Sequence, residues 1–190
     1  MDSSENDINK GLEVLRNGGV ILYPTETIWG IGCDATNEKA VQRIMELKPR
    51  EDREGFIILL DQDFKLNHYV RDVPDIAWDM IETDPQPLTI VYPEGMNVAP
   101  QVLSEDGSIA IRITSHILCK KLIKQLKKPI ISTSANLPGE EPPLYYEEID
   151  SGLKEKVDFS IMDEEGGLKE SKPSSIVKLG SKGEVEVLRD

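Results

Sequence analysis

Apolar residues recur along the chain at two spacings, which predict helices alternating with strands. Ile8, Leu12 and Leu15 fall three or four residues apart, as on one face of a helix, whereas residues 56–60 form a continuous apolar run typical of a strand buried on both faces. Helices are expected over residues 4–17, 38–48, 74–83, 115–127 and 144–156. Strands are expected over residues 20–23, 56–60, 88–92, 109–113, 129–132, 157–161, 174–179 and 184–188. The acidic, glycine-containing stretch 163–172 is expected to be a loop.

This order of elements indicates the fold class. Helices that alternate with apolar strands are typical of an α/β fold, and the short strands late in the chain favour a mixed sheet. The sequence contains no internal repeat and no low-complexity linker, and 190 residues suit one compact domain with a core of its own. We therefore expect residues 1–190 to form a single α/β domain.

Composition and charge narrow the classes of function. The longest clearly apolar run, residues 56–60, is far shorter than the roughly 20 residues of a membrane helix, and the acidic N-terminus does not resemble a secretory signal. Cys33 and Cys119 lie far apart without a CxxC motif, which predicts no dedicated metal site and a reducing, cytoplasmic location. The net charge of −13 argues against a general nucleic-acid binder. A phosphate-bearing ligand would need the few cations to be gathered in one place.

Three segments run from an apolar strand into small hydroxyl, amide or cationic groups. They are residues 23–32 (YPTETIWGIG), 109–114 (IAIRIT) and 130–136 (IISTSAN). Ligands of open α/β sheets bind at the carboxyl ends of strands, where such groups can hydrogen-bond an amino acid or a nucleotide. Each segment taken alone is equally compatible with an ordinary role, as a turn, a helix cap or a paired arginine in a strand.

A fourth cluster supplies positive charge in this acidic chain. Lys48, Arg50 and Arg53 follow the second expected helix. Cations near the C-terminus of a helix are favoured by its dipole, so a purely structural role is one interpretation. The other is a clamp on phosphate oxygens, for which arginine offers forked donors and lysine a compact charge.

Taken in order, four motifs resemble the YrdC family over residues 11–189, nearly the whole chain. They are YPTETIWGIGCDA, ELKPR, SIAIRIT and ISTSANLPGEEPP. The resemblance implies a twisted, open sheet of mixed parallel and antiparallel strands with flanking helices, YrdC/RibB-like, with a large concave site. It also implies a nucleotidyltransferase that makes threonylcarbamoyl-AMP and pyrophosphate from L-threonine, bicarbonate and ATP, with Mg²⁺ accompanying ATP. A tRNA-modifying threonylcarbamoyl transferase complex would be the partner, and weak tRNA binding is a further expectation.

The resemblance also assigns roles to residues, position by position. Threonine would be bound by Thr27, Arg112, Ser132 and Ser174, with Arg112 on its carboxylate. ATP would be bound by Lys48, Arg50, Arg53, Ser108, Ser134, Asn136 and Arg189, with Lys48 and Arg50 as the catalytic pair. Two positions depart from the family pattern: Glu54 stands where lysine or asparagine is usual, with Arg53 as the substitute charge, and Pro138 replaces a serine.

Other functions stay open at this level. A helix carrying Lys120, Lys121, Lys124, Lys127 and Lys128 would suit a non-catalytic RNA- or nucleotide-binding module of the same fold, although a solvated amphipathic helix explains it equally well. A sugar-phosphate lyase has weaker support, because Glu26 is the one acidic candidate near the three segments. No residue stands out as a general base, and His116 is more typical of a structural residue at a helix start.

Overall fold

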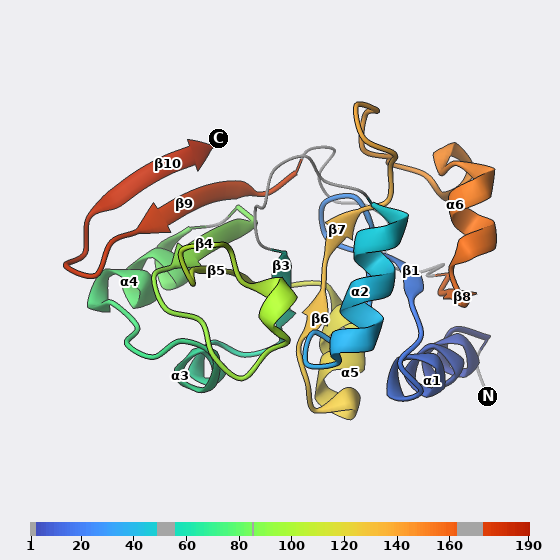
Figure 1. Ribbon diagram of the computed structural model, residues 1–190, viewed down its shortest axis with the longest axis horizontal. Helices are drawn as coiled ribbons and strands as arrows, with labels where there is room; N and C mark the ends of the chain where they lie inside the picture. Colours follow the sequence, from blue (N-terminus) through green and yellow to red (C-terminus); the bar gives the residue numbers. More distant parts are fainter. Residues whose placement is uncertain (1–2, 49–55, 85, 163–172) are drawn as a thin grey trace.

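The computed structural model describes residues 3–48, 56–84, 86–162 and 173–190 (Figure 1). The helices are α1 (Ser3–Arg16), α2 (Glu38–Leu47), α3 (Leu66–Tyr69), α4 (Asp75–Thr83), α5 (Ile117–Leu126) and α6 (Ser151–Lys156). The strands are β1 (Ile21–Pro24), β2 (Trp29–Gly32), β3 (Ile57–Leu60), β4 (Leu88–Tyr92), β5 (Ile109–Ile113), β6 (Ile130–Ile131), β7 (Thr133–Ser134), β8 (Phe159–Ser160), β9 (Ser175–Leu179) and β10 (Val185–Arg189). Short 3₁₀ turns cover Asp63–Lys65, Pro100–Val102 and Tyr146–Glu148.

The described strands form two open sheets with mixed strand directions. One has the order β7-β2-β1-β8 and the other the order β10-β9-β4-β5-β3-β6. In the larger sheet β3 is parallel to β5 but antiparallel to β6, and in the smaller one β1 is parallel to β8 but antiparallel to β2. The predicted class, an α/β fold with open mixed sheet structure, is therefore confirmed.

One stretch of chain belongs to both sheets. Residues 130–131 pair with β3 in the larger sheet, and residues 133–134 pair with β2 in the smaller one. Ser132 lies between the two pairings, and its backbone N–H donates to the carbonyl of Ile57 at 2.8 Å. The division into two sheets was not predicted, because a stretch this short has the apolar pattern of one strand.

Most expected elements are confirmed to within a few residues, but one helix is shorter than expected and the strand β2 was not predicted. Asn37 caps α2 as expected, since its side chain accepts from the N–H groups of Lys39 and Ala40. The helix expected over residues 144–156 is confirmed only in its second half, as α6: a 3₁₀ turn precedes it, and Asp150 caps α6 by accepting from the Leu153 N–H. Residues 29–32 form β2, although two glycines there weaken the pattern of a strand.

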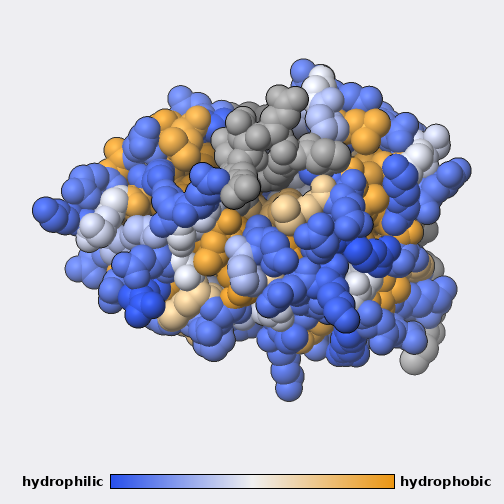
Figure 2. Space-filling view, in the orientation of Figure 1, coloured by the Kyte–Doolittle hydropathy of each residue, from blue (hydrophilic) through white to orange (hydrophobic). Residues whose placement is uncertain are grey.

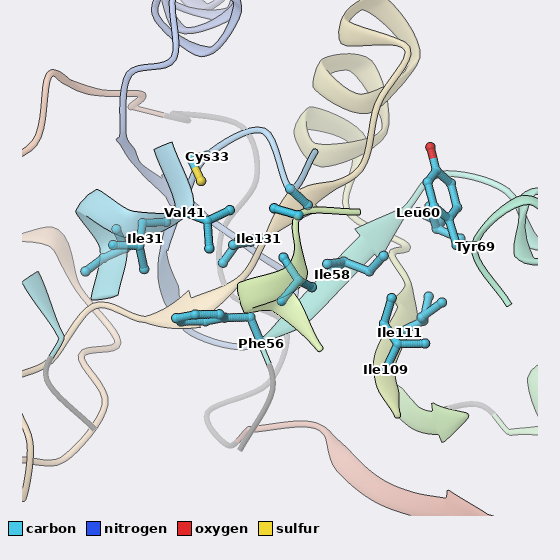
Figure 3. Packing of buried hydrophobic residues seen from close by; sticks show 14 of the residues in the cluster. Ile31, Cys33, Val41, Phe56, Ile58, Leu60, Tyr69, Ile109, Ile111 and Ile131 are labelled. Carbon is cyan, nitrogen blue, oxygen red and sulfur yellow. The ribbon is translucent and has the colours of Figure 1, made fainter. Parts of the chain in front are cut away.

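Two apolar clusters fill the interior on opposite sides of β3. Ile58 and Leu60 pack with Val41, Phe56 and other residues of the larger cluster, part of which is drawn in Figure 3. Leu59 belongs instead to the cluster beneath α1 and α5. This arrangement confirms the expected burial of β3 on both faces.

The outer surface is largely polar. Figure 2 shows one face of the molecule, on which hydrophilic residues predominate, in keeping with the 30% of charged residues in the chain. Across residues 3–48, 56–84, 86–162 and 173–190, no helix combines the length and apolar character needed to cross a bilayer.

Candidate functional site

A cavity of about 810 Å³ collects residues from both sheets. Its size is within the range of about 300–1,000 Å³ typical of ligand pockets. Of the residues expected to form the site, it is lined by Thr27, Ser108, Arg112, Ser132, Ser134, Ser174 and Arg189. The structure thus brings together the three hydroxyl-rich segments, which lie up to about a hundred residues apart in the sequence.

The turn between β1 and β2 presents Thr27 to this cavity. The Oγ1 of Thr25 accepts from the N–H groups of Thr27 and Ile28 at 3.1 and 3.3 Å, and donates to the Ile28 carbonyl at 2.8 Å. The same oxygen lies 3.0 Å from the Oγ1 of Thr27. Thr25 therefore stabilises the turn, as a threonine at this position often does, and Thr27 is the residue of the pair that lines the cavity.

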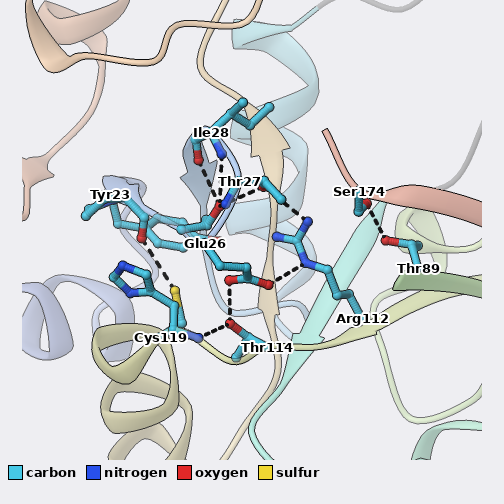
Figure 4. Close-up of polar contacts among 12 residues, drawn as sticks. Tyr23, Glu26, Thr27, Ile28, Thr89, Arg112, Thr114, Cys119 and Ser174 are labelled. Atoms are coloured by element: carbon cyan, nitrogen blue, oxygen red, sulfur yellow. Dashed lines mark hydrogen bonds and ion pairs between the residues drawn. The ribbon is translucent and has the colours of Figure 1, made fainter. Parts of the chain in front are cut away.

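Arg112 is a buried cation in the wall of the cavity. Only 4% of the residue is exposed, and its Nε lies 3.1 Å from the Oε1 of Glu26 (Figure 4). Its Nη1 donates to the Oγ1 of Thr27 at 3.4 Å, and Thr114 donates to the second oxygen of Glu26 at 2.8 Å. Because a buried charge is costly without a partner, this ion pair is what allows a guanidinium to remain at the site.

Lys48 joins the end of α2 to β7 and to the segment that follows it. Its Nζ donates to the carbonyl and Oγ of Ser134 at 2.7 and 3.2 Å, and to the Oδ1 of Asn136 at 3.1 Å. Lys48 is only 7% exposed. Lys48 and Asn136 thus adjoin the cavity through Ser134, which lines it.

Ser174 and Arg189 meet at another wall. Arg189, in β10, donates from Nε and Nη2 to the Ser174 carbonyl at 2.9 and 2.8 Å. The Oγ of Ser174 lies 2.8 Å from the Oγ1 of Thr89. These bonds fix the hairpin of β9 and β10 beside β4 and hold both residues at the cavity.

The structure does not describe two of the predicted site residues. Arg50 and Arg53, together with the unusual Glu54, lie outside the described residues. Their assignment to ATP phosphates stays a prediction, as do the ligand roles of all the residues that line the cavity.

Sequence reasoning missed a charged pair at the cavity. Lys178 of β9 and Asp106 both line it, and the Lys178 Nζ lies 2.9 Å from the Asp106 Oδ2. The hydrogen bond from Lys178 is the largest cause that holds the pKa of Asp106 far below its ordinary value. The alternation of β9 gave a usable signal, since Ile176 and Lys178 are two residues apart and therefore share one face.

The basic helix α5 and His116 are not part of the cavity wall that the described residues form. α5 buries Leu118, Leu122 and Leu126 as expected, while Lys128 pairs with Asp34 at 3.0 Å. Within the described ranges, neither the lysines of this helix nor His116 line the 810 Å³ cavity. The same ranges contain no group of three or more histidine, cysteine, aspartate or glutamate side chains placed to hold a metal ion.

Comparison with known proteins places these features in a family. The Sua5/YciO/YrdC model, described as telomere recombination, matches residues 13–190. A threonylcarbamoyl-AMP synthase of Pseudoalteromonas translucida is 34% identical over 177 residues, covering 92% of this chain and 94% of the relative. A protein of the same name from Hahella chejuensis is 40% identical over 170 residues, covering 89% of this chain and 91% of the relative.

A solved structure is similar over the same length. The crystal structure of P. abyssi Sua5 complexed with L-threonine matches with a TM-score of 0.85 at 28% identity. The match covers 96% of this chain but 53% of the Sua5 chain, so the present chain spans about half the length of that protein. Because the family model matches nearly all of the sequence and both synthases exceed 30% identity over most of it, the chain belongs to the Sua5/YciO/YrdC family.

Proposed function

We propose that this protein is an L-threonylcarbamoyladenylate synthase, which makes threonylcarbamoyl-AMP and pyrophosphate from L-threonine, bicarbonate and ATP. The observation that carries the proposal is the convergence on one cavity of a buried, paired arginine and a separate lysine-bound hydroxyl segment. The names of the two relatives and the threonine in the Sua5 complex support the same activity.

The cavity offers two regions with different chemistry. Arg112, with Thr27 beside it, suits the carboxylate of an amino acid, because a guanidinium binds carboxylates through paired hydrogen bonds. Ser132 and Ser174 would complete this threonine region.

The nucleotide would lie beside the threonine region. It would contact Ser108, Ser134, Asn136 and Arg189, with Lys48 at the phosphates. Arg50 and Arg53 would add charge along the triphosphate.

The reaction asks for positioning and charge stabilisation more than for covalent chemistry by the protein. Threonine and bicarbonate first give threonine carbamate and water. A carbamate oxygen then attacks the α-phosphorus of ATP, and the bond to the leaving pyrophosphate breaks. Hydroxyl, amide and cationic groups fixed around the phosphates would stabilise the charge that develops there. Mg²⁺ arriving with ATP would be held mainly by phosphate oxygens and water, because Mg²⁺ seldom has a dedicated protein cage.

The product would serve the modification of tRNA. A separate threonylcarbamoyl transferase complex would move the threonylcarbamoyl group to adenosine, and the lysines of α5 would give weak binding to tRNA. A steep dependence of that binding on salt is expected if phosphate contacts carry it.

Mass spectrometry tests the proposed activity directly. Purified protein incubated with ATP, L-threonine and bicarbonate is expected to form threonylcarbamoyl-AMP, and Arg112→Ala is expected to remove most of this product. Arg71→Ala is the matched control, because Arg71 forms an ion pair with Glu94 in which both side chains are well exposed. Nucleotide binding without product in the wild-type protein would favour the non-catalytic module instead.

A further inference from the structure

Glu26 is a buried acidic residue beside the cavity to which the proposed reaction assigns no role of its own. It sits in the turn after β1 and is 5% exposed. One of its oxygens lies 3.1 Å from the Nε of Arg112, and the other accepts from the Thr114 hydroxyl at 2.8 Å (Figure 4). Both carboxylate oxygens are thus already engaged inside the protein.

These contacts argue against two common roles for a buried carboxylate. A general base needs an oxygen that can reach a substrate proton, whereas one oxygen of Glu26 lies against Arg112 and the other accepts from Thr114. A metal ligand would need further acidic or histidine side chains nearby, and none of the described residues forms such a group around Glu26.

The position of Glu26 instead suits control of the orientation of the Arg112 guanidinium. A guanidinium binds a carboxylate strongly only when its planar donors are aimed at the oxygens. The Nη1 of Arg112 donates a long hydrogen bond of 3.4 Å to Thr27, whereas its Nε forms a 3.1 Å ion pair with Glu26 that lacks hydrogen-bond geometry. Glu26 therefore restrains the guanidinium by charge, and Thr27 adds a weak directional contact. Thr114 in turn fixes Glu26 from the far side.

We propose that Glu26 is a positioning residue that orients Arg112 for the carboxylate of the substrate amino acid. This inference rests on the proposed function, since it takes Arg112 to be the threonine-binding arginine. Glu26 would make the site select a ligand that carries an α-carboxylate, while the nucleotide region would be independent of it.

Removing the carboxylate has two opposing effects. The unpaired charge of Arg112 would attract any anion more strongly, while the guanidinium would lose its fixed orientation. Because Arg112 is only 4% exposed, a guanidinium left there without its ion-pair partner is costly and should turn toward water, and nothing among the described residues replaces that partner. The loss of a fixed orientation of the guanidinium should therefore be the larger effect, and threonine should bind more weakly.

Calorimetric titration of Glu26→Gln tests this role. Glutamine keeps the size of the side chain and an oxygen that can accept from Thr114, but removes the charge beside Arg112. L-threonine, L-threoninol (which lacks the carboxylate) and ATP are titrated in turn. Threonine affinity is expected to fall at least about tenfold, as for other broken buried charge pairs, with ATP affinity changed less than about twofold. The preference for threonine over threoninol should fall with it.

Two further variants separate positioning from a general structural role. Thr114→Val removes only the contact at the far oxygen of Glu26 and should weaken threonine binding less than Glu26→Gln does. The double variant Glu26→Gln/Arg112→Ala should bind threonine no more weakly than Arg112→Ala alone, because Glu26 acts through Arg112. If Glu26→Gln does not fold, Glu26→Asp, which withdraws the carboxylate, should show the same selective loss.

The possible results point to different conclusions. Unchanged or tighter threonine binding by the Glu26 variants, or a parallel loss of threonine and ATP affinity, would overturn the inference and leave the proposed function intact. Wild-type protein that binds ATP but no threonine would overturn the proposed function itself.

Discussion

At the scale of single residues, the cavity is built from polar groups that bind one another as well as facing the space between them. Lys48 is the clearest case, because three acceptors on two residues, Ser134 and Asn136, converge on its ammonium group. Paired in this way, the lysine is held in place before any ligand arrives. Preorganisation of this kind is what electrostatic stabilisation of a phosphate requires.

Lys48→Met should therefore impair turnover more than stability. If Lys48 stabilises charge on the phosphates, kcat/KM for ATP is expected to fall by about 10²–10³-fold, the usual cost of losing one such donor. Pyrophosphate release with threonine and bicarbonate present measures it. Lys39→Met, at an exposed position of α2, is the control, and equal rates for the two variants would remove Lys48 from the reaction.

Individual residues differed in how far they could be predicted. Thr27, Arg112 and Ser134 belong to distinctive motifs, and the cavity does gather them. Asp106 and Lys178 lie in segments without a motif, and their pairing depends on how a turn meets a distant strand, which no local pattern encodes.

At the scale of elements, β2 shows how close packing can require a glycine within a strand. A Cβ on Gly32 would collide with the backbone carbonyl of Ile131, which lies in the neighbouring sheet structure and cannot turn away. A Cβ on Gly30, two residues earlier, would meet the Ser132 Oγ at 3.5 Å, an ordinary contact. The two glycines that weakened the prediction of this strand thus have different roles. Only at Gly32 does the close approach of the Ile131 carbonyl require a glycine.

Gly32→Ala should destabilise the fold. The expected loss in the free energy of unfolding is about 1–3 kcal/mol, typical of overpacking against an immovable group. Chemical denaturation of Gly32→Ala and of Gly30→Ala, the matched control, measures it. A Gly32 variant as stable as the Gly30 variant would contradict the argument.

The helix expected over residues 144–156 forms only over its second half, α6, because of a helix cap. Its apolar and charged residues have an acceptable helical pattern, but the side chain of Asp150 binds the backbone N–H of Leu153 and starts a new helix there. Capping competes with continuation of a helix, and the sequence pattern alone does not decide between them.

At the scale of the whole molecule, Asp158 ties together parts that are distant in sequence. Its carboxylate accepts from Arg43 of α2 at 2.6 and 3.1 Å and from the backbone N–H of Val20 at 2.7 Å. The hydrogen bond from Arg43 is the main cause that lowers the pKa of Asp158 below its ordinary value of about 3.8. A helix, the start of β1 and the start of β8 therefore meet at one charge.

Asp158 should make stability depend on acidity. Because its pKa is lower in the folded state, the unfolded state takes up the proton first, so its contribution is present at neutral pH and is lost as the pH falls below the ordinary carboxyl range. Asp158→Asn should lower the free energy of unfolding by about 0.5–1 kcal/mol at pH 7, since the pair is partly exposed and screened. The difference from wild type should shrink in acid.

Denaturation curves at pH 7 and in the acid range check this expectation. Asp79→Asn, at an exposed aspartate of α4, provides the control. A deficit of Asp158→Asn that is constant across the pH series would contradict it.

The arrangement of the whole chain was predictable in class but not in detail. Alternating helices and apolar strands indicated an α/β fold, whereas the sorting of ten described strands into two sheets depends on pairings between short, distant segments. That residues 1–190 form one domain stays a prediction.

The stretch 130–134 limits where members of the family can accept insertions and deletions. It is anchored to β3 at one end and to β2 at the other, with a single residue, Ser132, between the anchors. Adding or deleting one residue there would put the stretch out of register with β3 or with β2, because a shift of one residue turns the side chains of a strand to the opposite face. Natural variants of this protein should thus differ at these positions by substitution, and place their insertions and deletions elsewhere.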